Sequence, residues 1–459
     1  MVKFLREAAG VVPSKRQLMW YDTAFYAFIH FGMNTFTDRE WGDGTEPESL
    51  FAPAHLDCGQ WASVLRAAGI RGMILTAKHH DGFCLWPSRY TEHSVKNAAC
   101  KRDVVGEAAS ACRAAGLSFG VYLSPWDRNC ACYGTPEYND YYCAQLEELL
   151  TGYGELFCVW LDGACGEGPN GRRQEYDFPR YIKMIRKYQP NAVIFYDKGP
   201  DVRWCGNEAG NCRVSEWAVV PSELCPLAPV QTGPGPLAGE GDLTDLYNTD
   251  RFVGGMSSIL YSRGLSFVPS EVDTSIRPGW FWHSQENPRP LRTLFEIYMG
   301  AVGGNACLNL NIPPDRDGLL DARDVARLME LRRLIDREFG NPLEVTVKQQ
   351  KNGYSTQPAY LITLAHPVSR VRYVELREEI EKGQRIETFR IEAVFHEGKN
   401  YPLYQGATVG NRKICALTDP FAEQNRLLDS SGDKTDKLLV KVTAARGEVS
   451  LKEIKVYGE

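Results

Sequence analysis

Polar side chains stand at the ends of five short apolar segments in the first half of the chain. They are His30, Lys78, His79, His80, Asp81, Tyr122, Ser124, Asp127, Asp162, Tyr196, Asp197 and Lys198. Carboxyl and imidazole groups can act as nucleophiles, general acids or general bases, and they also bind substrate hydroxyls. The pattern therefore predicts an active site built from the ends of several strands.

Asp162 is the strongest candidate for a reacting group. It directly follows the apolar run LFCVWL, so its carboxylate would emerge where that strand ends. There it could serve as a nucleophile or a general base. An aspartate that caps the next helix, or that holds the turn before Gly163, would fit the same position, and the local sequence leaves both interpretations open.

His79 and His80 are adjacent, so in a regular strand they would face opposite sides. At a strand end the alternation can break, and both rings could then bind hydroxyls in one pocket. One core histidine beside one surface histidine is an alternative, and a zinc or iron site is another.

Tryptophans accompany these polar groups at or between the strand ends. They are Trp41, Trp126, Trp160, Trp280 and Trp282. A single tryptophan is usually a core residue, but a group of indoles beside carboxyl and imidazole groups suits the C–H faces and hydroxyls of a sugar. We therefore expect a carbohydrate site.

The elements that must position these residues alternate between strand and helix. Apolar runs at 24–32, 72–80, 118–126, 155–163 and 192–199 are typical of strands buried on both faces. Helical patterns lie between them, two of them capped by Asp57 and Asp103, and return at 291–301 and 322–338. This order favours a (β/α) barrel rather than a small doubly wound sheet.

The pattern changes twice further along the chain. A stretch rich in proline and glycine at 221–242 predicts a long loop. From residue 343 onward, alternating runs such as AYLITLA and KLLVKVTA predict an antiparallel β-sandwich. We place the boundary near residues 339–342, which divides the chain into a catalytic barrel at 1–339 and a sandwich at 340–459.

Charge and composition exclude several kinds of partner. The formal net charge is −6, which argues against nucleic-acid binding through clustered Lys and Arg. The apolar residues at the N-terminus are interrupted by Arg6 and Glu7, so no signal peptide is predicted, no membrane partner is expected, and the chain as written would be cytoplasmic. Cys130 and Cys132 lack a second pair of ligands for zinc, so free thiols are favoured over a metal or redox pair.

At these residues the chain resembles glycoside hydrolase family 29, the α-L-fucosidases. The matching segments are FIHFGMNTFTDREWG, LTAKHHDGFCLWPS, DVVGE, GVYLSPWD, VWLDG and LNLNIPPDRDG, and they cover most of residues 15–335 in order. The resemblance implies an irregular (β/α) barrel followed by an antiparallel β-sandwich. It also implies a fucosylated oligosaccharide or glycoconjugate as substrate, with no cofactor and no metal.

The resemblance also assigns residues. Asp162 matches the family nucleophile, and a second group matches positions that line the fucose pocket: His30, Glu40, Trp41, His79, His80, Tyr122 and Trp160. The segment DVRWCGNEAG is similar to the branch that acts on α-1,3- and α-1,4-linked fucose, in which Glu208 would be the acid/base. The segment SEVDTSIRPGWFWH, also similar to that branch, would bring Glu271, Arg277 and Trp280 near the pocket.

Together these assignments imply a retaining exo-α-L-fucosidase that acts on branched, Lewis-type glycans by double displacement. A permissive fucosidase that also cleaves α-1,2 linkages and aryl fucosides is the alternative. The residues alone leave three other functions open. They are a barrel glycosidase of another sugar specificity, a carbohydrate-binding protein without activity, and a metal-dependent hydrolase that uses His79 and His80.

Overall fold

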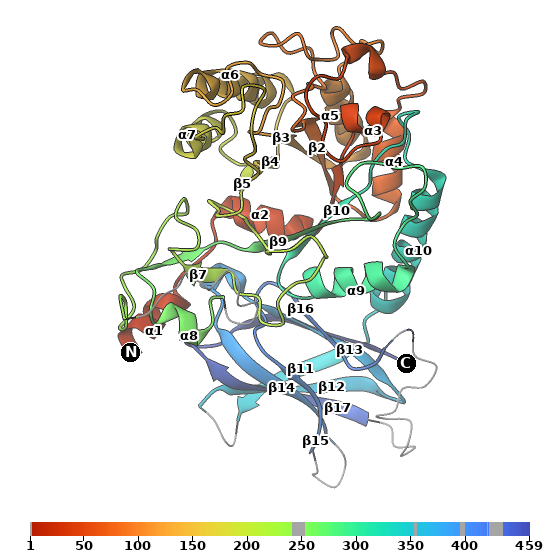
Figure 1. The fold of residues 1–459 in the computed structure, drawn as a ribbon. Helices are drawn as coiled ribbons and strands as arrows, with labels where there is room; N and C mark the ends of the chain where they lie inside the picture. Colours follow the sequence, from red (N-terminus) through yellow and green to blue (C-terminus); the bar gives the residue numbers. More distant parts are fainter. Residues whose placement is uncertain (1, 241–252, 353–355, 395–399, 420, 422–434) are drawn as a thin grey trace.

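The computed structural model describes residues 2–240, 253–352, 356–394, 400–419, 421 and 435–459. A barrel with its helices forms one end of the molecule and a β-sandwich forms the other (Figure 1). Among the described residues, no helix is both long enough and apolar enough to cross a membrane.

Eight parallel strands form the barrel sheet in the order β5-β4-β3-β2-β1-β10-β9-β6. Their bounds are β1 Phe25–Ile29, β2 Gly72–Lys78, β3 Ser118–Leu123, β4 Cys158–Trp160, β5 Val193–Phe195, β6 Arg203–Trp204, β9 Ser270–Ser275 and β10 Cys307–Asn311. A parallel bridge between Phe195 and Val202 brings the end of β5 beside the start of β6, so the sheet nearly closes. The predicted barrel is confirmed.

Helices surround the strands (Figure 1). They are α4 Cys58–Ala67, α5 Val104–Ala115, α6 Glu137–Gly152, α7 Phe178–Tyr188, α9 Leu291–Ala301 and α10 Ala322–Phe339, together with the short α2 Lys15–Thr23 and α3 Met33–Thr37. Two further short helices, α1 Val2–Ala9 and α8 Met256–Ile259, lie away from the barrel strands at the lower left of Figure 1. The predicted caps form, because Asp57 accepts from the backbone N–H of Gln60 and Asp103 from that of Gly106. These caps fix where α4 and α5 begin and hence how long the preceding loops are.

The C-terminal part consists of two antiparallel sheets. The larger one has the order β11-β12-β17-β14-β15, and the smaller one β16-β13-β18. Their bounds are β11 Val345–Lys351, β12 Pro358–Val368, β13 Val371–Glu378, β14 Ile386–Val394, β15 Asn400–Gly406, β16 Lys413–Ala416, β17 Thr435–Ala445 and β18 Leu451–Gly458. The predicted sandwich is confirmed, whereas the division into domains at residues 339–340 stays a prediction.

Most of the predicted long loop lies in the described part of the chain, and there it is a loop. A short strand β7, Val219–Pro221, pairs with β8, Leu265–Phe267, and residues 222–240 follow without a helix or strand. The last two residues of the predicted loop, 241 and 242, lie outside the described residues.

Candidate active site

Asp162 lies just beyond β4, at the carboxyl end of the barrel. Its Oδ2 accepts a hydrogen bond of 2.8 Å from the Tyr122 hydroxyl, and its Oδ1 accepts one of 2.7 Å from the backbone N–H of Ala164. The side chain is 22% exposed, and His80 Nε2 lies 3.9 Å from Oδ2. Asp162 is thus an oriented carboxylate that a substrate can still reach.

His80 is held in one tautomer by Ser124. The Ser124 hydroxyl donates to the carbonyl of Trp126 at 2.7 Å, so its oxygen must accept from Nδ1–H of His80, also at 2.7 Å. Burial lowers the pKa of His80, although the charge of Asp162 opposes this. The ring is therefore neutral near pH 7, and its Nε2 carries a lone pair on the Asp162 side.

His79 has the opposite tautomer. The Asn34 side-chain amide donates to the carbonyl of Glu40 at 3.1 Å and lies 3.2 Å from His79 Nδ1, which therefore accepts. Burial lowers the pKa of His79 well below its ordinary value. Its proton consequently sits on Nε2, which is a hydrogen-bond donor.

His30 follows the same logic as His80. The Asn311 amide donates to the carbonyl of Trp280 at 2.7 Å, so Asn311 Oδ1 accepts from His30 Nδ1–H at 2.8 Å. Burial lowers the pKa of His30 to about 3. The centroids of the His30 and His79 rings are 5.8 Å apart, and those of His79 and His80 are 4.1 Å apart. The three rings therefore form one neutral cluster with fixed donors and acceptors.

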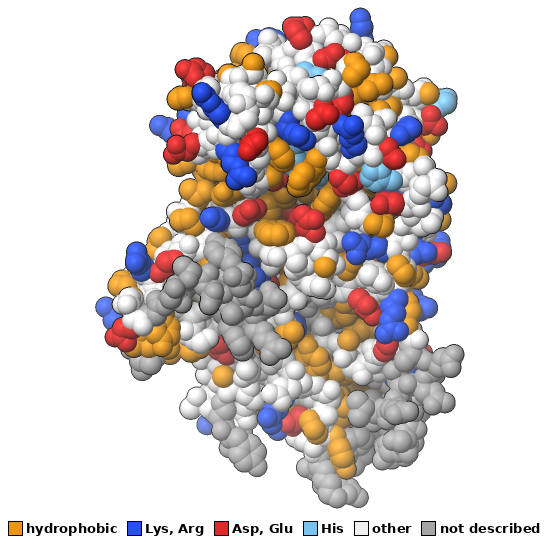
Figure 2. Space-filling model, in the orientation of Figure 1, with side chains coloured by type: hydrophobic (Ala, Val, Ile, Leu, Met, Phe, Trp, Pro, Cys, Tyr) orange, Lys and Arg blue, Asp and Glu red, His pale blue; other side chains and the backbone are white. Residues whose placement is uncertain are grey.

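Aromatic rings enclose this cluster. Trp160 stacks on Phe195 with a centroid distance of 4.2 Å. Trp41, which is 59% exposed, lies 5.7 Å from Trp126 and 6.0 Å from His80 by ring centroids. Figure 2 shows hydrophobic and acidic side chains side by side in a hollow in the upper half of this face. An exposed indole beside an imidazole cluster is suited to stacking against a sugar.

Glu208 belongs to the loop after β6. The hydroxyl of Thr274 donates to the Glu208 carbonyl at 2.7 Å, and the indole N–H of Trp280 donates to its Oε2 at 3.2 Å. Glu208 is exposed, and the Trp280 ring lies 5.0 Å from that of His30. Trp280 thus connects the Glu208 carboxyl with the histidine cluster.

Glu271 supports the pocket from inside the barrel. It is fully buried on β9, where its Oε1 accepts from the Trp160 indole at 2.8 Å and from the Asn309 amide at 3.1 Å. The Tyr26 hydroxyl donates to its Oε2. Burial raises the pKa of Glu271 to about 7. The structure therefore places Glu271 beneath Trp160, as the group that orients the indole.

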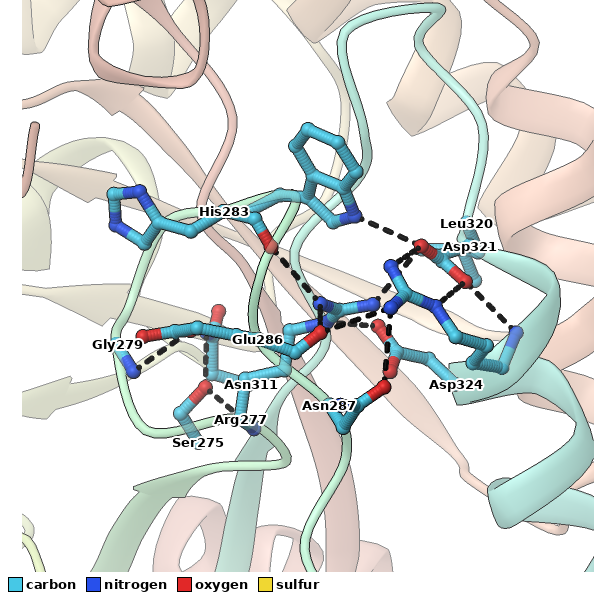
Figure 3. Close-up of polar contacts among 12 residues, drawn as sticks. Ser275, Arg277, Gly279, His283, Glu286, Asn287, Asn311, Leu320, Asp321 and Asp324 are labelled. Carbon is cyan, nitrogen blue, oxygen red and sulfur yellow. Dashed lines mark hydrogen bonds and ion pairs between the residues drawn. The ribbon is translucent and has the colours of Figure 1, made fainter. Parts of the chain in front are cut away.

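Arg277 is also fully buried, and Figure 3 shows the side chains and backbone groups that it contacts. Its guanidinium binds Asp324 at 2.7 Å, forms an ion pair of 3.0 Å with Asp321, and donates to the carbonyls of His283 and Glu286. Arg277 therefore anchors the loop of residues 278–287, and Trp280 is the residue of this loop that reaches Glu208.

Other predicted polar groups are structural or lie beside the nucleophile candidate. Lys78 pairs with Asp127 at 2.9 Å in the interior, and both are buried. Asp197 packs against Gly163, where an added Cβ would lie 2.2 Å from its Oδ2. Burial, assisted by the charge of Asp162, raises the pKa of Asp197 to about 6. Within the described ranges, no three His, Cys, Asp or Glu side chains are grouped to hold a metal ion.

Sequence reasoning missed the amides that fix the histidines, Asn34 and Asn311, and it missed Asp273. Asp273 is buried on β9, and its Oδ1 has no hydrogen-bond partner. The signal for Asn311 was the alternation in LNLN, which points Asn309 and Asn311 to the same side of β10. Asn34 gave no such signal because it lies in a helix.

Comparisons with known proteins show the family of the chain. Residues 12–218 match the family model described as α-L-fucosidase. The chain is 38% identical to α-L-fucosidase 1 of Arabidopsis thaliana, over 93% of this chain and 86% of that protein.

Two solved structures share the whole architecture. One is a glycoside hydrolase 29 family member from an unknown rumen bacterium, which is 37% identical with a TM-score of 0.82, over 98% of this chain and 77% of that one. The other is a GH29 fucosidase of Ruminococcus gnavus in complex with fucose, which is 28% identical with a TM-score of 0.80, over 98% and 95% of the two chains. On its sequence, fold and strand-end residues, the chain belongs to glycoside hydrolase family 29 and is an α-L-fucosidase.

Proposed function

We propose that the protein is a retaining exo-α-L-fucosidase that releases terminal α-1,3- or α-1,4-linked fucose from branched, Lewis-type glycans. The observation that carries the mechanism is the placement of Asp162, held by Tyr122 and Ala164 at the end of β4 and open to the pocket. The Ruminococcus gnavus relative, whose structure contains fucose, supports the choice of sugar.

In the first step Asp162 attacks the anomeric carbon and forms a covalent fucosyl-enzyme, while Glu208 donates a proton to the leaving oxygen. In the second step Glu208 takes a proton from water, which displaces Asp162 and releases fucose with its configuration retained. The Tyr122 hydroxyl orients the attacking carboxylate throughout.

The histidine cluster suits the sugar hydroxyls. His30 and His80 offer acceptor nitrogens and His79 offers a donor, because the other nitrogen of each ring is already engaged. Hydroxyls can donate and accept, so fixed partners of both kinds define one orientation of the sugar. Glu40, Trp41 and Trp160 would complete the pocket.

Replacement of the two carboxyls tests the mechanism. Asp162→Ala should lower turnover by several orders of magnitude, and azide should restore activity with a fucosyl azide of inverted configuration as product. Near-normal turnover in Asp162→Ala would reject the assignment of Asp162 as the nucleophile.

Glu208→Ala should lose far more activity on oligosaccharides than on aryl fucosides, because a good leaving group needs no proton.

Linkage preference is tested with three substrates. The motivation is the similarity of GNEAG, which contains Glu208, to the branch-specific group. We expect kcat/KM on Lewis a or Lewis x trisaccharide to exceed that on 2'-fucosyllactose and on nitrophenyl fucoside, because contacts to the neighbouring sugar contribute in the transition state. Equal or faster cleavage of the α-1,2 substrate would favour the permissive alternative.

A further inference from the structure

His283 bridges two carboxylates at the rim of the barrel. Its Nδ1 lies 2.8 Å from Asp38 Oδ1 and its Nε2 lies 2.7 Å from Glu40 Oε1. The His283 side chain is 17% exposed, whereas Asp38 is 59% and Glu40 is 38% exposed. The imidazole is therefore the shielded centre of an Asp38–His283–Glu40 bridge whose outer members face solvent or the pocket.

The backbone at Asp38 directs its side chain toward this bridge. Asp38 follows α3 in the left-handed conformation, with φ of 58°, and its N–H bonds the carbonyl of Asn34. Residues other than glycine adopt this conformation at a cost in free energy, although aspartate tolerates it better than most. The turn ends α3 and places Asp38 two residues before Glu40, so both carboxylates reach the same ring.

Glu40 is tied to the opposite loop at three points. Its Oε1 accepts from His283 and from the backbone N–H of Phe281 at 3.1 Å, and its Oε2 accepts from the backbone N–H of Trp280 at 2.8 Å. The same Trp280 donates its indole N–H to Glu208. The position of Glu40 and the position of the Trp280 ring are therefore set by one short segment, residues 280–283.

Only an imidazolium can donate to both carboxylates at once, because a neutral ring has a single N–H. Burial lowers the pKa of His283, but the hydrogen bonds to Asp38 and Glu40, assisted by the charges of Glu40 and Glu286, raise it above its ordinary value. The guanidinium of Arg277 donates to the backbone carbonyl of His283 at 3.2 Å (Figure 3). Loss of the proton would leave a ring lone pair against one carboxylate and release one end of the bridge.

We propose that His283 is a positioning residue, which as an imidazolium holds the Trp280 loop against Glu40 and so keeps the fucose pocket assembled. When His283 loses its proton, the loop is released from Asp38 or Glu40 and fucose affinity falls. This inference rests on the proposed function, in which Glu40 and Trp280 line the fucose pocket.

The test compares His283→Gln and Asp38→Asn with His55→Gln. His55 is a matched control, because it is an exposed imidazole whose ring lies 3.8 Å from one carboxylate, that of Asp317, and does not bridge two. The dissociation constant of L-fucose is measured by calorimetry between pH 5.5 and 9, thermal melting checks that each variant is folded, and kcat/KM is measured on nitrophenyl fucoside.

In the unmodified protein and in His55→Gln, we expect fucose affinity to fall at alkaline pH with a midpoint above 6.5, the ordinary value for histidine. Asp38→Asn should move this midpoint to lower pH, because one of the two anions is gone. His283→Gln should abolish the step and bind fucose on the order of tenfold more weakly at pH 6, since a charge-assisted hydrogen bond is lost.

The inference is overturned if folded His283→Gln keeps the affinity and pH dependence of the unmodified protein, or if Asp38→Asn leaves the midpoint unmoved. Failure of the proposed function would look different, because the unmodified protein would then neither bind L-fucose nor cleave nitrophenyl fucoside.

Discussion

At the scale of single residues, the hydroxyl of Tyr122 is the side-chain donor that holds the Asp162 carboxylate, at 2.8 Å. Tyr122 also packs against Trp160 and His79, with ring centroids 5.2 and 5.9 Å away. Removing only the hydroxyl would leave this packing intact and allow the carboxylate to rotate away from the attacking geometry. The hydrogen bond should therefore matter for catalysis more than for folding.

Tyr122→Phe is expected to lower kcat/KM on nitrophenyl fucoside by roughly 10- to 100-fold, the value of a hydrogen bond to a charged group. Tyr142→Phe is the matched control, because Tyr142 is equally buried but donates to the backbone carbonyl of Leu123. That control should lose thermal stability and keep its activity. Unchanged kcat/KM in Tyr122→Phe would contradict the orienting role.

The sequence was informative about some of these residues and silent about others. Asp162, His79 and His80 could be identified as candidates because each directly follows an apolar strand. Whether each histidine nitrogen donates or accepts a hydrogen bond could not be predicted. This depends on Ser124 and Asn34, which the fold brings to the rings from other parts of the chain. Glu271 and Arg277 were expected near the pocket from the resemblance. The structure buries both, so that Glu271 holds the Trp160 indole and Arg277 holds the loop at His283.

At the scale of elements, β9 shows how a strand of unusual sequence supports the site. Glu271, Asp273 and Ser275 alternate with Val272 and Thr274, so three polar side chains share one face of β9. Glu271 lies in the interior with Tyr26 and Trp160, where a charged carboxylate is unfavourable.

Helices were easier to predict than this strand. The amphipathic patterns at 291–301 and 322–338 predicted the bounds of α9 and α10 to within one residue.

The buried Glu271 makes a specific prediction about pH. Its pKa of about 7 lies above the ordinary 4.5, so the folded protein holds a proton that the unfolded chain releases. Its contribution is therefore favourable below about pH 4.5 and is lost as the pH rises to about 7, by on the order of 3 kcal/mol.

Glu271→Gln resembles the protonated form at every pH. Its melting temperature relative to the unmodified protein should rise between pH 5 and about pH 7, and the difference should then level off. Glu344→Gln, at an exposed position before β11, should show no such trend. Parallel melting curves for Glu271→Gln and the unmodified protein across this range would mean that Glu271 is ionised throughout.

At the scale of the whole molecule, the sandwich contacts the segment that continues from the Glu208 loop. The Gln384 amide accepts from the backbone N–H of Ala218 at 2.8 Å and donates to the carbonyl of Glu216 at 3.2 Å. The Arg446 guanidinium lies 3.5 Å from the centre of the Trp217 ring. All three residues of this segment are buried, so the sandwich supplies partners that solvent could not replace.

We therefore expect the sandwich to be part of the folding unit of the enzyme. Gln384→Ala leaves the buried N–H of Ala218 without its partner, whereas the Glu216 carbonyl keeps a hydrogen bond of 2.9 Å from the Asn305 amide. The variant should therefore lose about 1–3 kcal/mol of unfolding free energy. It should also lower kcat/KM on nitrophenyl fucoside, since residues 216–218 continue the chain from Glu208. Gln349→Ala, at an exposed position on β11, is the control and should resemble the unmodified protein.

A chain ending at residue 342 should fail to fold, as judged by circular dichroism and activity. If that shorter chain folds and cleaves nitrophenyl fucoside at the full rate, the barrel is independent, and the contacts made by Gln384 and Arg446 join two separately stable domains.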